Sequence, residues 1–207
     1  METLKEMPRQ SPIENSLSKA MSYDQYLSLL NELAANNSTT GKDKSDAFIG
    51  HTKMNAKRVK RWEKTMKISY EHVKAISSVD LDLEWIVLVE SWCGDGAHVL
   101  PAIKKVADFN NKIDLKVALR DENEDLMNNF LTNGSQAIPK LIAIDKKSKE
   151  VLFTYGPRPS EASLLVKDFI KNHGRLTPEF KEDLQRWYNK DKGQTTINDL
   201  AEILVAL

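Results

Sequence analysis

The feature that most constrains the fold is a continuous apolar run, Trp85–Val89 (WIVLV), near the middle of a chain of 207 residues. Five apolar residues without polar alternation are typical of a strand that is buried on both faces of a sheet. A polar segment that contains the chain's single cysteine, Glu90–Gly96 (ESWCGDG), follows at once. We therefore expect a central buried strand that ends where this cysteine lies.

The segments after this strand alternate between helical and strand periodicity. The polar stretch Asp145–Glu150 (DKKSKE) predicts a hairpin turn between two short strands. The expected elements are a helix over Val99–Phe109, a strand over Ile113–Leu119, a helix over Glu122–Leu131, strands over Leu141–Ile144 and Val151–Tyr155, and a helix over Ser160–Lys171. This order predicts an α/β fold with a central mixed sheet flanked by helices.

Further helices are expected on both sides of this unit. Apolar residues have helical spacing over Tyr23–Ala35 and over residues 54–76, and turn formers fill the loop Asn36–Asp46 between them. Thr177 and Pro178 predict the start of a helix that ends near Asn189, and a last helix is expected from Thr195 or Thr196. We divide the chain into an N-terminal helical extension over 1–82, an α/β domain over 83–173 and a C-terminal helical extension over 174–207.

Composition argues against several classes of partner. The chain has 30 Lys and Arg residues and 30 Asp and Glu residues, so it lacks the positive field that binds nucleic acid. The polar segment Met1–Ser18 lacks the apolar run of a secretory signal or membrane span, so we expect a cytoplasmic protein without a membrane partner. One cysteine cannot form an internal disulfide, which also agrees with a cytoplasmic location.

Two motifs suggest thiol chemistry. The Trp92–Cys93 pair lies at the end of a buried strand and before a helix, where free N–H groups stabilise a thiolate and lower the pKa of a cysteine. Ile138–Pro139 precedes the next strand, where a cis proline would present its backbone to the sulfur. Asp95 has the opposite effect on the thiolate, because a nearby negative charge disfavours it. The sequence leaves the net pKa of Cys93 open.

With these motifs the chain resembles the thioredoxin superfamily over about Leu83–His173. WCGD stands in place of the Trp-Cys-Gly-Pro-Cys site, and Ile138–Pro139 in place of the cis-proline loop. The chain is similar in particular to bacterial thioredoxin-like proteins that combine a WCGD site with an added N-terminal helical segment. Gly96 occupies the position of the second cysteine, so the resemblance implies a monothiol site.

The resemblance also implies roles for individual residues. Cys93 takes the position of the nucleophile, and Glu90 lies near where the family keeps a buried acid that assists proton transfer. A carboxylate at a strand end that is satisfied by a neighbour is the equal alternative for Glu90. The residues implied to contact substrate are Trp92, Gly94, Asp95, Ile138 and Pro139.

Other side chains have simpler interpretations. We expect Asp95 to cap a helix rather than to act as an acid, and His98 to have a surface or packing role. Arg158 would face the site by the family's geometry, but a solvated loop residue is the better-supported interpretation. The four scattered histidines show no metal-ligand spacing, so no metal or other cofactor is expected.

Three functions follow from the sequence. The first is a monothiol oxidoreductase, in which Cys93 forms a mixed disulfide that an external thiol resolves; its partners would be protein thiols or disulfides, or a low-molecular-weight thiol. The second is a non-catalytic binding or chaperone-like module that keeps the fold and its groove. The third resembles single-cysteine glutaredoxins, which hold an iron–sulfur cluster across a dimer, although only the lone cysteine supports it. No feature indicates an oligomeric state.

Overall fold

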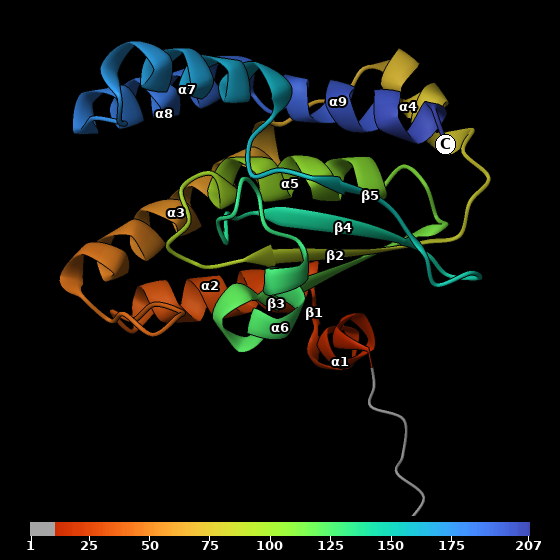
Figure 1. Ribbon diagram of the computed structural model, residues 1–207, viewed down its shortest axis with the longest axis horizontal. Helices are drawn as coiled ribbons and strands as arrows, with labels where there is room; N and C mark the ends of the chain where they lie inside the picture. Colours follow the sequence, from red (N-terminus) through yellow and green to blue (C-terminus); the bar gives the residue numbers. More distant parts are fainter. Residues whose placement is uncertain (1–10) are drawn as a thin grey trace, which may run out of the picture.

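A computed structural model describes residues 11–207, and a five-stranded mixed sheet lies at its centre (Figure 1). The central strand pairs in parallel with β3 and antiparallel with β4, and the two edge strands are both antiparallel to their neighbours. Residues Trp85–Val89 are fully buried, which confirms the prediction from the apolar run. In sheet order the strands are β1 (Met21–Ser22), β3 (Ile113–Leu119), β2 (Leu83–Val89), β4 (Lys140–Asp145) and β5 (Val151–Tyr155).

Helices cover both faces of this sheet (Figure 1). One face carries α1 (Pro12–Lys19), α2 (Tyr23–Ala35) and α6 (Glu124–Asn129), and the other carries α5 (Gly96–Ala107). A further layer lies over α5 and consists of α7 (Ser160–His173), α8 (Pro178–Asp191) and α9 (Gln194–Val205). This is the thioredoxin-like α/β fold with added helices that the sequence predicts.

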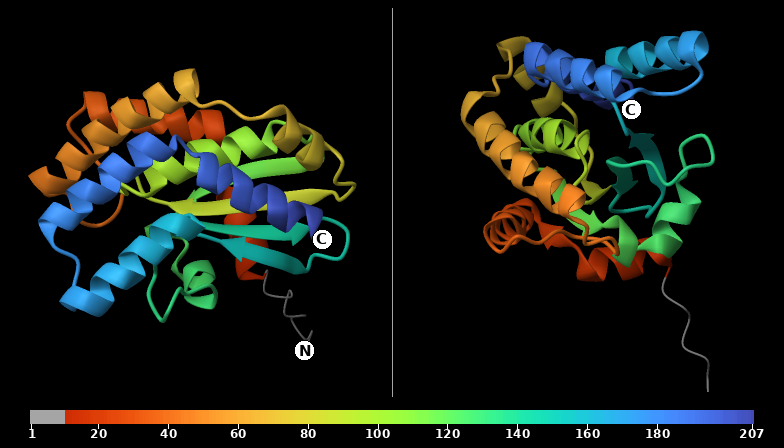
Figure 2. Two further views of the ribbon diagram at one scale, coloured as in Figure 1. Left: turned by 90° about the horizontal axis from the view of Figure 1, so that it is seen from above. Right: turned by 90° about the vertical axis from the view of Figure 1, so that its left-hand side faces the viewer.

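Helix α3 (Asp46–Thr65) joins the two helical layers. The right-hand view of Figure 2 shows it crossing from the layer of α7–α9 to that of α2, beside the sheet. It packs against both α2 and α5. Residues of α3 and of α8 lie beside the turn that follows β2. The N-terminal and C-terminal extensions therefore both reach this end of the sheet.

Two local predictions were wrong, and two short elements were not predicted. The helix expected over residues 54–76 is two helices, because the chain is extended at Met66 and the Ser69 hydroxyl accepts the His72 N–H to start α4 (Tyr70–Ser77). The helix expected over Glu122–Leu131 is shortened to α6, after a 3-10 turn over Arg120–Glu122. Helix α1 and strand β1 were not predicted, since β1 has only two residues and is defined by its pairing with β3.

Among residues 11–207, one hydrophobic core connects the sheet with the terminal helices. Its buried side chains include Tyr26 on α2, Trp62 on α3, Tyr188 on α8 and Leu200 on α9, in addition to the strands. Within residues 11–207, no helix has both the length and the apolar character needed to cross a bilayer.

Candidate functional site around Cys93

Cys93 lies in the turn between the end of β2 and the start of α5. The Cys93 N–H donates to the Glu90 carbonyl at 3.0 Å, which closes the turn. The Gly96 N–H, one of the free amides in the first turn of α5, donates to Cys93 Sγ at 3.2 Å. The residue is 7% exposed. The sulfur therefore occupies the helix N-terminus that the sequence predicts, but it is almost covered.

The cis-proline loop supplies the second contact to the sulfur. The Ile138–Pro139 peptide bond is cis, and the thiol donates to the Ile138 carbonyl with an Sγ–O distance of 3.3 Å. The structure thus brings together the two motifs that the sequence separates by more than forty residues. Donation to a carbonyl needs the proton, so this contact favours the neutral thiol.

Burial dominates the acidity of Cys93. It raises the pKa of the thiol to about 12, the Asp95 carboxylate adds to the rise, and the Gly96 amide opposes it. Desolvation therefore outweighs the stabilisation that a helix N-terminus gives a thiolate. The resting sulfur is protonated at neutral pH.

Gly96 has no room for the side chain of a second cysteine. A Cβ added at this position would lie 2.6 Å from Val89 Cγ2 and 3.4 Å from Cys93 Sγ. The first distance is far shorter than a carbon–carbon contact allows, and Val89 is a fully buried residue of the central strand. The site is therefore packed around a glycine, in addition to lacking the second thiol.

Asp95 is held by an ion pair and a hydrogen bond. Arg158 Nη2 lies 2.8 Å from Asp95 Oδ2, and the Tyr188 hydroxyl donates to Asp95 Oδ1 at 2.9 Å. Burial raises the pKa of Asp95, while the charge of Arg158 and the bond from Tyr188 lower it. Asp95 occupies the N-cap position of α5, as the sequence predicts, but its side chain makes no cap bond there. The expectation for Arg158 is corrected, because Arg158 pairs with Asp95 instead of lying in solvent.

His98 on α5 packs against α3 and α8. Its Nδ1 accepts the Trp62 indole N–H at 3.0 Å, which leaves the proton on Nε2 for donation to Gln185 Oε1 at 3.0 Å. The ring stacks on Tyr188 with centroids 4.4 Å apart. Burial lowers the pKa of His98 to about 3, so the ring is neutral. His98 thus has the packing role that the sequence analysis allowed, and it attaches α8 to α5.

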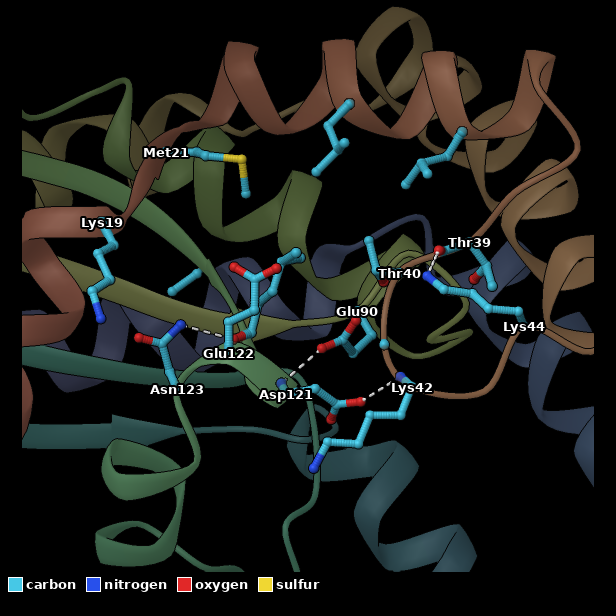
Figure 3. A pocket seen from close by; sticks show the side chains of 15 residues that line it. Lys19, Met21, Thr39, Thr40, Lys42, Lys44, Glu90, Asp121, Glu122 and Asn123 are labelled. Atoms are coloured by element: carbon cyan, nitrogen blue, oxygen red, sulfur yellow. Dashed lines mark hydrogen bonds between the residues drawn. The ribbon is translucent and has the colours of Figure 1, made fainter.

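Glu90 faces a different cavity (Figure 3). This Glu90 cavity has a volume of about 480 Å³ and lies between α2, the loop at Thr40 and the end of β3. Oε1 accepts the Asp121 N–H at 2.9 Å, and Oε2 is buried without a partner among the described residues. Burial raises the pKa of Glu90. Glu90 is not among the residues that surround the sulfur, so direct proton transfer between them has no support in this geometry.

Cys93 opens on a second cavity of about 690 Å³, here called the Cys93 cleft. Its walls come from α3, the turn at 92–95, the segment at 136–138, the loop at 157–158 and α8. The predicted contact residues Trp92, Gly94, Asp95 and Ile138 line it, whereas Pro139 itself does not. Both extensions of the chain therefore help to build the cleft.

The residues that sequence reasoning missed come from these extensions. Arg58 on α3 and Gln185 and Tyr188 on α8 all approach the turn at Cys93. They carry no motif, and only the tertiary packing of α3 and α8 brings them to the site. No three His, Cys, Asp or Glu side chains in the described chain gather closely enough to hold a metal ion.

The comparisons with known proteins agree with this fold. A protein of unknown function from Pseudomonas aeruginosa has a similar structure, with a TM-score of 0.54 and 16% identity over 88% of this chain and 96% of that one. An HIV epitope-scaffold is similar to the same degree, with a TM-score of 0.54 and 16% identity over 90% of this chain and 99% of that one. At this identity the likeness shows the fold alone.

A comparison with curated proteins found no match. A family model described as thioredoxin matches residues 41–171, which include α3 and α4 as well as the sheet from β2 to β5. The matched segment is more than half of the chain and contains Cys93 and the cis-proline loop. The chain therefore belongs to the thioredoxin family.

Proposed function

We propose that this thioredoxin-family protein performs thiol–disulfide exchange through the single thiol of Cys93, with a mixed disulfide that an external thiol resolves. The observation that carries the proposal is the position of Sγ. Cys93 lines a cleft of about 690 Å³, and its Sγ is held between the Gly96 amide and the Ile138 carbonyl. The proposed partners are protein thiols or disulfides, or a low-molecular-weight thiol.

The reaction balances without a second cysteine. Deprotonated Cys93 Sγ attacks one sulfur of a disulfide, a new S–S bond forms, and the other half leaves as a thiolate that takes up a proton. An external thiol then attacks the ligand's sulfur, forms a disulfide with it and releases Cys93 as a thiol. One half of the original disulfide has left as a thiol, the other half is now joined to the external thiol, and Cys93 returns unchanged.

The protonated resting state sets the rate of this reaction. With a pKa of about 12, only a very small fraction of the molecules carries the thiolate at neutral pH. Exchange is therefore expected to be slow and to accelerate about tenfold with each pH unit up to the pKa, because only the thiolate attacks.

A second function is favoured by the same burial. The sulfur is nearly covered, and the neighbouring Gly96 has no space for a second cysteine side chain. A binding module that no longer catalyses exchange could have the same features. In that case the Cys93 cleft holds a partner without a covalent step, and binding survives the replacement of Cys93.

The test is the pH dependence of Cys93 alkylation by iodoacetamide, combined with intact mass after addition of oxidised glutathione. A discrete adduct that excess reduced thiol removes supports exchange, and Cys93→Ser serves as the control. If alkylation proceeds at high pH but no adduct forms, exchange is refuted and the binding function is left.

A further inference from the structure

We propose that the Cys93 cleft selects organic ligands that carry a negative charge near the reacting sulfur, and that Arg58 binds this charge. The inference rests on the proposed function, because it names the substrate class of the same sulfur. Substrate recognition would then come from helix α3, which lies outside the sheet and the turn that carry the thiol.

Arg58 stands directly over the cysteine turn. Its Nη1 lies 3.9 Å from the position that a Cβ would take on Gly94, the residue after Cys93. The same nitrogen donates to Asn55 Oδ1 at 3.0 Å, and Asn55 Nδ2 donates to the Ser91 carbonyl at 2.8 Å. These bonds tie the guanidinium to the turn, so that its position relative to the sulfur is fixed before a ligand arrives.

The charge of Arg58 has no counterion in the described part of the chain. No Asp or Glu oxygen there lies within 4.0 Å of its guanidinium, although the side chain is half-buried against the cleft. A partly desolvated cation without a partner is unfavourable, and a planar guanidinium pairs well with a carboxylate. An anionic ligand would remove this cost.

The unpaired side-chain charge in the rest of the cleft is also positive. Its acids are already engaged: Asp95 pairs with Arg158, and Glu182 lies 3.8 Å from Arg186. Arg158 also keeps a buried Nε without an acceptor among the residues described. The cleft's cationic side chains are Arg58, Arg120, Arg158 and Lys181, of which Arg120 pairs with Asp121 and Arg158 with Asp95. Arg58 and Lys181 have no carboxylate oxygen within 4.0 Å in the described chain, so the unpaired cations of this partly enclosed space concentrate anions near the sulfur.

Apolar side chains complete the cleft and indicate an organic ligand. Phe48 and Trp92 lie together in its wall with ring centroids 4.7 Å apart, and Met54, Leu176 and Leu184 also line it. A ligand that combines a carbon skeleton with a carboxylate fits this lining better than an inorganic anion. A small carboxylate-bearing disulfide or thiol has this chemistry.

The experiment compares three small symmetrical disulfides that differ mainly in charge. Dithiodiglycolate is anionic, bis(hydroxyethyl) disulfide is neutral and cystamine is cationic. The rate of mixed-disulfide formation at Cys93 is followed by intact mass at about pH 9, where more thiolate is present. Each rate is divided by the rate of free N-acetylcysteine amide with the same disulfide, which removes the intrinsic reactivity of the probe.

In the wild-type protein we expect the normalised rate to be about tenfold higher for the anionic than for the neutral probe, and lowest for the cationic one. Arg58→Gln keeps a side chain that can bond to Asn55 and should abolish this preference, so that the normalised rates of the anionic and neutral probes become equal. Arg58→Lys should restore part of it. Lys57→Gln is the matched control, since it removes an exposed charge from the neighbouring position. Equal normalised rates for all three probes, or a preference that survives Arg58→Gln, would overturn the inference.

A second measurement separates this inference from the proposed function. Adipate, a dicarboxylate without sulfur, should slow the alkylation of Cys93 by the neutral reagent iodoacetamide, and Arg58→Gln should remove the protection. If no disulfide reacts, exchange fails while protection by adipate still upholds the anion site. If disulfides react but adipate gives no protection and charge has no effect on rate, exchange stands and the anion site is refuted.

Discussion

Replacing Gly96 by alanine tests whether this position excludes a side chain. The added Cβ would lie 2.6 Å from Val89 Cγ2, whereas carbon atoms in contact are about 3.5–4.0 Å apart. The overlap of about 1 Å falls on the fully buried central strand, where overpacking costs about 1–3 kcal/mol. The gain in helix propensity offsets less than about 1 kcal/mol at the start of α5. We therefore expect Gly96→Ala to lower the free energy of unfolding by about 1–2 kcal/mol.

A double-mutant cycle identifies the contact responsible. Val89→Ala removes Cγ2 and should itself cost about 2 kcal/mol, because it deletes two buried methyl groups. In that background Gly96→Ala should cost almost nothing, so the two positions should couple by about 1–2 kcal/mol. Urea unfolding followed by tryptophan fluorescence measures all four proteins. A Gly96→Ala protein as stable as the wild type, or a cost that is unchanged when Val89 is alanine, would show that Gly96 and Val89 are not in steric conflict.

Two further substitutions test the groups around the site. Glu90→Gln should leave the rate of Cys93 alkylation unchanged, because the two residues face different cavities. Burial raises the folded-state pKa of Glu90, so the wild type should lose stability as pH rises through that pKa, and unfolding at several pH values should show no such loss in Glu90→Gln. Tyr188→Phe removes a bond to the buried Asp95 and should cost about 1.5–3 kcal/mol at neutral pH and less in acid, where Asp95 is protonated. Tyr70→Phe is its control, since Tyr70 is 79% exposed; an equal loss in both variants, or one that does not vary with pH, would contradict the assigned bond.

The central strand, the hairpin and the position of Cys93 were predictable because each depends on local pattern. An apolar run such as Trp85–Val89 indicates a strand that is buried on both faces. The start of any helix has free N–H groups, whatever its surroundings. The acidity of Cys93 was not predictable in the same way. It depends on how deeply the sulfur is covered, and that is decided by the cis-proline loop and by segments far away in the sequence.

The errors in secondary structure have a similar origin. The apolar spacing continues through residues 54–76, so periodicity alone predicts one helix. In the structure the Ser69 hydroxyl caps the start of a second helix, α4, and this local hydrogen bond is not visible in the periodicity. Strand β1 has two residues and exists through its pairing with β3, a contact that no local pattern contains.

By itself the sequence determined the thioredoxin-like order of elements, the single thiol and the glycine at the second-cysteine position, because these are properties of residue type and spacing. The tertiary structure decided that the thiol is buried and protonated and that Glu90 faces another cavity. It also brought Arg58 on α3 and Tyr188 on α8 to the turn at Cys93. The physical reason is that burial and electrostatic interactions depend on distances between atoms, and packing brings together residues that are far apart in sequence.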